Sequence, residues 1–336
     1  MKLLKRLAFG LAGLCALLLL IGFLLPSNAR VERSILIDRP ASVIFPLLNS
    51  YQRFNQWSPW FALDPAAVYT YSGPQSGVGA SMAWTGNEQV GTGKQTITLS
   101  EPDSRVETDL DFGEMGVAKA SLVLTAEGEG TRLTWSFATD LGNNPLNRYF
   151  GLMVDKFVGA DYERGLAQLK TLAEKLPKVD IAGLTVDTVE LSARPMLYVT
   201  ASSTKDMQAI SQAYGVAYQQ ILAQIEALGL KQAGAPLGID NYWDERGYGF
   251  DAAIPVDRTD VALQAPVQAG ISYAGRALRL RHVGGYDGLV PALEQLRAYA
   301  QIHDLKTRDR VYSEFVSDPG STAEAELITD LYLPVE

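Results

Sequence analysis

Residues 249–256 read GFDAAIPV, and residues 324–335 read EAELITDLYLPV. Both runs have the apolar content of buried strands, and each ends in a proline between apolar residues, Ile254-Pro255-Val256 and Leu333-Pro334-Val335. The sequence before each run repeats the same order of predicted elements, a strand, an amphipathic helix and a second strand. This repetition predicts two βαββ units within residues 179–336.

The first predicted unit has strands at 195–203, 236–243 and 249–256 and a helix at 206–228, and the second has strands at 277–283, 311–316 and 324–335 and a helix at 287–303. Each helix has a single apolar stripe, which must pack on a sheet. Two such units bury their sheet faces together, and the junction between repeats is a common place for a ligand. We therefore expect a cleft at the junction.

Aromatic residues are frequent in this segment and give the cleft its expected chemistry. A cation within ~6 Å of the centroid of an aromatic ring is stabilised by ~0.5–2 kcal/mol. The alternative role for each ring is ordinary packing in the core. The segment carries 12 basic and 21 acidic residues, which disfavours nucleic acid and favours a cationic or neutral ligand. The candidate ligand-binding residues here are Glu314, Tyr242, Trp243, Tyr248, Phe250, Tyr273, Tyr286, Tyr312 and Tyr332.

The preceding segment, residues 30–178, has a different pattern. A strand at 33–38 and two short helices are followed by six alternating strand runs between 68 and 141, separated by turn signals such as Ser72-Gly73-Pro74. A long amphipathic helix then ends before Pro177. This order predicts an antiparallel meander that curves around a long helix and leaves a cavity, for which Trp84 and Trp135 are the candidate ligand-binding residues.

Two stretches of this segment carry a family resemblance. The opening RSILIDRPASVIFPLLNSYQRFNQWSPWFALDP, with Trp57-Ser58-Pro59-Trp60, and the final long helix resemble the START/polyketide-cyclase-like superfamily, also called SRPBCC or helix-grip. The resemblance covers about residues 30–178. It implies an apolar internal cavity for lipids or similar molecules, and only some members are enzymes.

The last segment resembles the GyrI-like effector-binding domain over about residues 184–336. The resemblance lies in YGFDAAIPV at 248–256, HVGGY at 282–286 and VSDP at 316–319. It implies an aromatic cleft that binds amphipathic, often cationic molecules opposite a buried glutamate. The position of that glutamate is Ser313 here, and Glu314 follows it. Because strand side chains alternate, the two residues point to opposite faces unless a bulge intervenes.

The N-terminus predicts a membrane anchor. Residues 7–25 lack charges, follow Lys2, Lys5 and Arg6, and are long enough as a helix to span a bilayer. The positive-inside rule then predicts an inner-membrane protein with a single span and its globular part on the periplasmic or extracytoplasmic side. A signal peptide cleaved after residues 27–29 is the alternative.

We therefore expect an α+β protein with a transmembrane anchor at 1–29, a helix-grip domain at 30–178 and a duplicated GyrI-like domain at 179–336. Cys15 is the single cysteine, and His282 and His303 are the only histidines, so we expect no metal site and no cofactor. The predicted function is binding of lipophilic small molecules, cationic ones among them. The alternatives are a hydrolase that uses Glu314 with a tyrosine, and a structural protein with filled cavities.

Overall fold

The computed structural model describes residues 2–308 and 310–336, with side chains at 9–14, 16–114, 116–308 and 310–336. The chain divides into two compact units, the first ending at Ala182 and the second spanning Gly183–Glu336. Each unit combines helices with one antiparallel sheet, so the predicted α+β class is correct.

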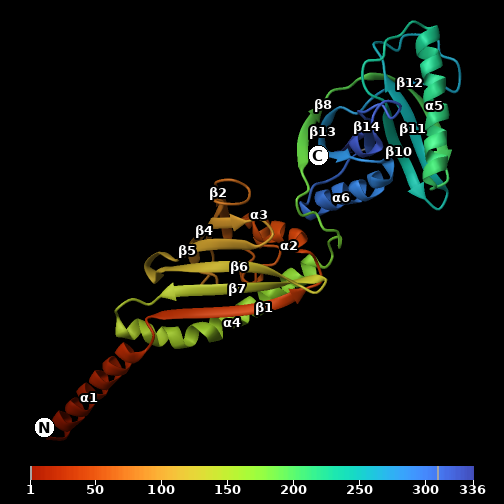
Figure 1. Cartoon of the computed structure of the whole chain (residues 1–336). Helices are drawn as coiled ribbons and strands as arrows, with labels where there is room; N and C mark the ends of the chain where they lie inside the picture. The colour runs from red at the N-terminus through yellow and green to blue at the C-terminus, as the bar shows by residue number, and fades with distance from the viewer. Residues whose placement is uncertain (1, 309) are drawn as a thin grey trace. The chain divides into compact units, whose positions relative to one another are not determined.

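The first unit contains a seven-stranded sheet with the order β1-β7-β6-β5-β4-β3-β2 (Figure 1). Its strands are β1 (Asn28–Ile37), β2 (Val68–Ser72), β3 (Ser81–Thr85), β4 (Thr92–Glu101), β5 (Arg105–Asp111), β6 (Val117–Glu127) and β7 (Gly130–Asp140). Its helices are α1 (Lys2–Leu24), α2 (Ala41–Leu48), α3 (Tyr51–Phe54) and α4 (Pro145–Ala173). Apart from β1, the strands form a meander because each short turn joins neighbours in the sheet.

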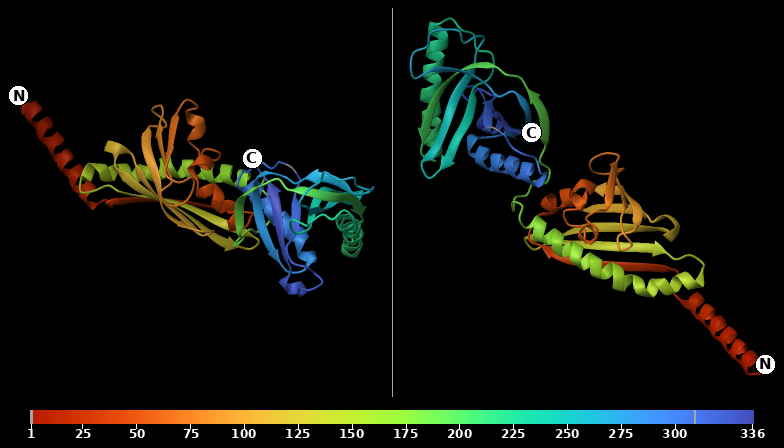
Figure 2. Two further views of the ribbon diagram at one scale, coloured as in Figure 1. Left: turned by 90° about the horizontal axis from the view of Figure 1, so that it is seen from above. Right: turned by 180° about the vertical axis from the view of Figure 1, so that it is seen from behind.

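Helix α4 lies along the sheet beside β1 (Figures 1 and 2). Asn144 caps its first turn, since its side chain accepts a hydrogen bond from the amide of Leu146. Arg33 on β1 donates to Glu163 at 2.7 Å and to Asp155 at 3.0 Å, both on α4. Buried apolar side chains from both elements then fill the space between the helix and the curved sheet.

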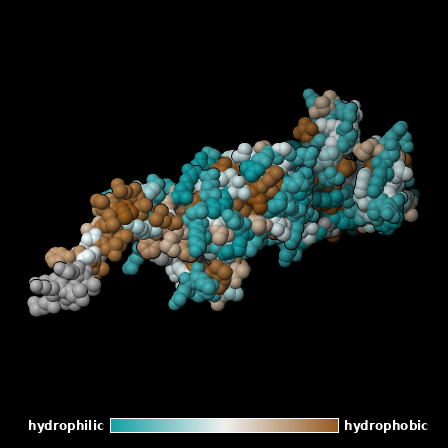
Figure 3. All heavy atoms as spheres, turned by 90° about the horizontal axis from the view of Figure 1, so that it is seen from below, coloured by the Kyte–Doolittle hydropathy of each residue, from teal (hydrophilic) through white to brown (hydrophobic). Residues whose placement is uncertain are grey.

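Helix α1 carries the apolar N-terminal run, and apolar side chains gather on its surface (Figure 3). It is joined to α4 by polar contacts: the Tyr149 hydroxyl donates to the Leu18 carbonyl at 2.6 Å, and Arg148 Nη1 donates to the Phe23 carbonyl at 2.9 Å. Within the residues that the structure describes, no helix is both long and apolar enough to cross a bilayer.

This finding contradicts the predicted transmembrane helix at residues 7–25 and the predicted inner-membrane location. Residues 7, 8 and 15 of the predicted span lie outside the side chains that the structure describes.

The second unit contains an eight-stranded sheet with the order β12-β9-β11-β10-β14-β15-β13-β8. Its strands are β8 (Val186–Leu191), β9 (Pro195–Ser203), β10 (Leu237–Asp244), β11 (Gly247–Pro255), β12 (Gln268–Ile271), β13 (Gly275–Val283), β14 (Tyr312–Phe315) and β15 (Ile328–Pro334). Its main helices are α5 (Met207–Ala227), which packs on β9 and β11, and α6 (Leu289–Ile302), which packs on β13 and β15 (Figures 1 and 2).

Strands β9, β10 and β11 with α5 form one repeat, and β13, β14 and β15 with α6 form the other. The repeats join along β10 and β14, where Gly238 pairs with Ser313, Leu237 with Glu314, and Ile239 with Tyr312. A pseudo-twofold axis therefore passes through the Gly238–Ser313 pair. It makes Leu237 equivalent to Tyr312 and Ile239 equivalent to Glu314.

The two faces of this sheet have separate cores. The face toward α5 and α6, called the helix face below, carries Leu197 and Phe250 in one repeat and Leu278 and Leu331 in the other. The opposite face, called the back face, carries a cluster that crosses the junction of the repeats. Its buried members are Met196, Leu237, Ile239, Ala253, Tyr312 and Tyr332.

Candidate functional site

Seven aromatic residues meet on the helix face and form what we call the helix-face cluster. Its members are Tyr214 and Tyr218 on α5, Trp243 on β10, Tyr248 and Phe250 on β11, Tyr286 just before α6, and Phe315 on β14. Tyr214 stacks on Phe250 with centroids 3.8 Å apart, and Phe315 contacts Tyr214 at 5.8 Å and Tyr286 at 5.5 Å. The cluster therefore joins the two repeats across the pseudo-twofold axis.

A carboxylate lies inside this cluster. The Tyr248 hydroxyl donates to Asp240 Oδ1 at 2.8 Å, and the hydroxyls of Tyr214 and Tyr248 are hydrogen-bonded at 3.0 Å. Arg297 on α6 is the nearest cation, 3.7 Å from Asp240 Oδ2. Burial raises the pKa of Asp240, and the opposing effects of Tyr248 and Arg297 are smaller. A half-buried carboxylate among aromatic rings is complementary to a cation.

Asp240 was not among the predicted ligand-binding residues; it pairs directly with Phe250, and a β-bulge after it decides which aromatic residues share its face. The pairing of β10 with β11 shifts by one residue between Asp240 and Tyr242. Asp240 and Trp243 consequently share the helix face, whereas Tyr242 lies over Gly249 on the back face. A Cβ atom on Gly249 would come within 2.1 Å of the Tyr242 ring. The available signal was an acidic residue in a strand that is otherwise largely apolar or aromatic.

The helix face also contains a buried hydroxyl. Thr329 is 0% exposed, and its Oγ1 has no hydrogen-bond partner among the described residues. Thr329 pairs with Phe315 on the neighbouring strand. It is two residues before Leu331, which packs on α6, so its side chain also points to the helix face. A buried hydroxyl without a partner lowers the stability of the fold by ~1–3 kcal/mol. Thr329 is therefore expected to destabilise the sheet beside the helix-face cluster.

Glu314 points to the back face, and Ser313 to the helix face. Arg194 Nη1 donates to Glu314 Oε1 at 2.8 Å, and the Tyr332 hydroxyl donates to Oε2 at 3.2 Å. The side chain of Glu314 is 15% exposed. Burial, followed by the nearby Glu314, raises the pKa of Tyr332 to about 12. Glu314 is thus separated from the helix-face cluster and already has a counterion.

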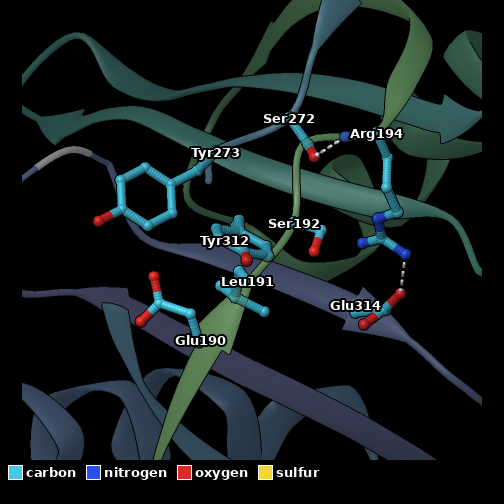
Figure 4. Close-up of a pocket in the computed structure, with 8 residues that line it drawn as sticks. All are labelled: Glu190, Leu191, Ser192, Arg194, Ser272, Tyr273, Tyr312 and Glu314. Atoms are coloured by element: carbon cyan, nitrogen blue, oxygen red, sulfur yellow. Dashed lines mark hydrogen bonds and ion pairs between the residues drawn. The ribbon is translucent and has the colours of Figure 1, made fainter. Parts of the chain in front are cut away.

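A pocket of about 220 Å³ opens beside this ion pair on the back face (Figure 4). It is called the back-face pocket below. Strand β14 supplies two side chains, the linker before β9 supplies Arg194, and the linker before β13 supplies Tyr273. The lining residues are Glu190, Leu191, Ser192, Arg194, Ser272, Tyr273, Tyr312 and Glu314.

The sequence candidates therefore fall into three groups. Trp243, Tyr248, Phe250 and Tyr286 are on the helix face with Asp240. The back face has Tyr242, Tyr273, Tyr312, Tyr332 and Glu314, and Tyr312 and Tyr332 are stacked at 4.9 Å.

The third group, Trp84 and Trp135, is in the other unit. Trp135 stacks on Tyr162 at 3.7 Å and contacts Trp57 and Trp60, whereas Trp84 is half-buried and donates to the Val90 carbonyl at 3.2 Å. Among the described side chains, no group of three or more His, Cys, Asp or Glu residues has a geometry suited to a metal ion.

Solved structures similar to this chain have low identity and low TM-scores. They include the EcmrR C-terminal domain (14% identity, 46% of this chain and 98% of that one, TM-score 0.42) and a hydrolase from Listeria innocua (16%, 45% and 92%, TM-score 0.34). A third is Ara h 8.0201 (14%, 44% and 99%, TM-score 0.34). Comparison with curated proteins gave no match.

Family models match both units. Residues 28–174 match the family described as polyketide cyclase / dehydrase and lipid transport, and residues 184–336 match the GyrI-like small molecule binding domain. The chain is therefore a fusion of a domain of the polyketide cyclase / dehydrase and lipid transport family with a GyrI-like domain, and both are small-molecule binding modules.

Proposed function

We propose that this protein binds lipophilic small molecules and that the helix-face cluster holds a cationic one. The observation that carries the proposal is Asp240, a half-buried carboxylate hydrogen-bonded to Tyr248 within a set of aromatic rings. The side chain of Trp243 is exposed and lies 5.2 Å from the Tyr248 ring. A ligand therefore has an aromatic surface to approach from solvent.

The charge balance at Asp240 favours an added cation. Arg297 is 3.7 Å away, beyond hydrogen-bond distance, and its side chain is 48% exposed, so it neutralises Asp240 incompletely. A ligand cation closer to the carboxylate would offset part of its desolvation cost. Each aromatic face that it contacts adds ~0.5–2 kcal/mol.

We infer a second, lipophilic site in the first unit, near Trp84 rather than Trp135. Trp135 is 4% exposed and has aromatic rings on several sides, which leaves its faces occupied. Trp84 is half-buried at the far end of the sheet and contacts Phe112 at 6.1 Å. An apolar ligand would gain contact area at Trp84 without displacing core residues.

The hydrolase alternative has less support from the geometry. A general base needs a carboxylate oxygen that is free to accept a proton from a reacting group. Both oxygens of Glu314 already accept hydrogen bonds, one from Arg194 and the other from Tyr332. Binding is therefore the better account of this domain.

The test is titration of the full chain with tetraphenylphosphonium and with neutral triphenylphosphine oxide, by calorimetry. We expect saturable binding of the cation, and we expect Asp240→Asn to weaken it about tenfold, equal to ~1.4 kcal/mol, with little effect on the neutral probe. Asp244→Asn is the matched control, because Asp244 is on the same strand but is exposed and paired with Arg246.

Two results would contradict the proposal. One is the absence of saturable cation binding to the unaltered protein. The other is equal cation affinity in the unaltered protein and in Asp240→Asn, once both are verified as folded by circular dichroism.

A further inference from the structure

The back-face pocket is separate from the helix-face cluster, because the sheet lies between them. Its volume of about 220 Å³ corresponds to roughly seven water molecules at ~30 Å³ each. Drug-sized ligands occupy pockets of ~300 Å³ or more. The pocket therefore suits a molecule about as large as an amino acid.

The two ends of the pocket differ in charge. Figure 4 shows Glu190 on one side of the hollow and Arg194 with Glu314 on the other, with Ser192 and Tyr312 between them. The carboxylate of Glu190 is thus separated by open space from the guanidinium of Arg194, and the carboxylate of Glu314 lies beyond that guanidinium. The three charged side chains sum to −1.

Polar groups on both sides remain available to a ligand. Within the described part of the chain, the Glu190 carboxylate has no hydrogen bond or ion pair, and its cross-strand neighbour Arg276 donates to the Glu336 carbonyl instead. Arg194 uses one side-chain nitrogen, Nη1, for Glu314 and keeps its remaining guanidinium donors. Tyr312, only 5% exposed, has a hydroxyl without a hydrogen bond in the same part of the structure.

The linkers hold the Arg194 end in place. The Arg194 amide donates to Ser272 Oγ at 3.0 Å, and the Ser272 amide donates to the Arg194 carbonyl at 2.9 Å. This reciprocal pair fixes the β8–β9 linker to the β12–β13 linker. Glu314, which also accepts a hydrogen bond from the Tyr332 hydroxyl, then orients the guanidinium from the sheet. The positive end is therefore preorganised, which lowers the entropic cost of binding.

The pseudo-twofold symmetry provides an internal reference for these residues. Sheet pairing makes Tyr312, Glu314, Tyr332 and Glu190 equivalent to Leu237, Ile239, Ala253 and Ile271, respectively. The first repeat and its edge strand β12 thus have apolar side chains at all four positions. The second repeat and its edge strand β8 have two carboxylates and two phenols there, so the shared backbone plan does not require polar groups at these positions.

We propose that the back-face pocket binds a small zwitterion of amino-acid size, with its ammonium at Glu190 and its carboxylate at the free edge of Arg194. The charges then alternate along the pocket, from Glu190 through the two ligand groups to Arg194 and Glu314. A simple amine leaves the Arg194 edge without a partner, and a simple carboxylate lies near Glu190 without a compensating cation. The zwitterion satisfies both ends.

The test is calorimetric titration of the full chain with four probes of matched chain length. Two are isomeric zwitterions, 6-aminohexanoate and L-norleucine, whose charge separations differ, and two carry a single charge, hexylamine and hexanoate. We expect one of the zwitterions to bind at least tenfold more tightly than either singly charged probe.

Two variants test the ends separately. Glu190→Gln alters an exposed side chain, and we expect it to reduce zwitterion affinity at least fivefold, whereas the control Glu245→Gln, an exposed acid in the turn between β10 and β11, has no effect. The double variant Arg194→Leu, Glu314→Ile removes the other end without leaving an unpaired charge. We expect it to reduce zwitterion affinity to that of hexylamine.

Three results would overturn the proposal: hexylamine or hexanoate binding as tightly as both zwitterions, no saturable binding of any probe, or unchanged zwitterion affinity in Glu190→Gln. Asp240→Asn separates this site from the helix-face cluster, since it is expected to weaken tetraphenylphosphonium binding and leave zwitterion binding intact. Loss of zwitterion binding in that variant would also count against the back-face site.

Discussion

The two repeats of the second unit have the same backbone plan, but next to the pseudo-twofold axis they place a carboxylate on opposite faces. At equivalent positions beside the pseudo-twofold axis, the first repeat has Ile239 and Asp240, and the second has Glu314 and Phe315. The first repeat therefore directs its acid to the helix face, and the second directs its acid to the back face. The order of the apolar and the acidic residue is reversed between the two repeats. The helix face and the back face therefore differ in chemistry, although the backbone is duplicated.

The largest effect is expected at Phe250, whose equivalent on the helix face of the second repeat is Thr329. Phe250 is 0% exposed and stacks on Tyr214. Phe250→Ala should reduce the free energy of unfolding of the second unit by ~3–5 kcal/mol, because it removes a fully buried ring. Hydrogen exchange of β9 and β11 under increasing urea measures this loss. A loss below ~1 kcal/mol would mean that Phe250 is not a core residue.

The next effect concerns Glu314 and its apolar equivalent Ile239. Arg194→Leu leaves a largely buried carboxylate without its cation, and we expect a loss of about 2 kcal/mol in stability. Adding Glu314→Ile, which installs the residue of the first repeat, should recover most of that loss. A double-mutant cycle by urea denaturation measures the coupling. Additive single losses would show that the pair is not coupled.

The pH dependence of stability should distinguish Asp240 from its neighbour Asp244. Burial raises the pKa of Asp240, so its contribution to stability is most favourable at low pH and declines as pH rises from its ordinary pKa through the raised value. Hydrogen bonding to Arg246 lowers the pKa of Asp244, so its contribution is present above its ordinary pKa and is lost as pH falls through the lowered value.

Denaturation of Asp240→Asn and Asp244→Asn between pH 3 and pH 7 tests this contrast. Relative to the unaltered protein, Asp240→Asn should gain stability as pH rises, and Asp244→Asn should lose it. Trends of the same sign in both variants would refute the contrast.

The smallest effect is expected at Thr329. Thr329→Val replaces a buried hydroxyl that has no described hydrogen-bond partner with a methyl group of similar size. We expect a gain of about 1 kcal/mol, because the desolvation cost of the unpaired hydroxyl is removed and no hydrogen bond is lost. Thr329→Ser keeps the hydroxyl and removes the methyl group, and it serves as the control. A loss above ~1 kcal/mol in Thr329→Val would reveal a polar contact at this position.

The two family resemblances, the order of strands and helices and the duplication in the second unit could all be read from local sequence patterns. Period-two and helical spacing of apolar residues carry that information locally, as in the two runs that end at Val256 and Val335. The prediction from apolar content was wrong at the N-terminus. It gave a membrane-spanning helix, and the described part of the structure contains none.

Which candidate residues lie close together could be seen only in the folded chain. Whether Tyr242 or Trp243 shares the face of Asp240 depends on one extra residue in β10, and a bulge of that kind leaves little trace in apolar spacing. The counterion of Glu314 is Arg194, 120 residues away in the chain and brought close by the joining of two linkers. Side-chain partners across a duplicated sheet are set by register and chain closure, which are properties of the whole fold rather than of any local stretch.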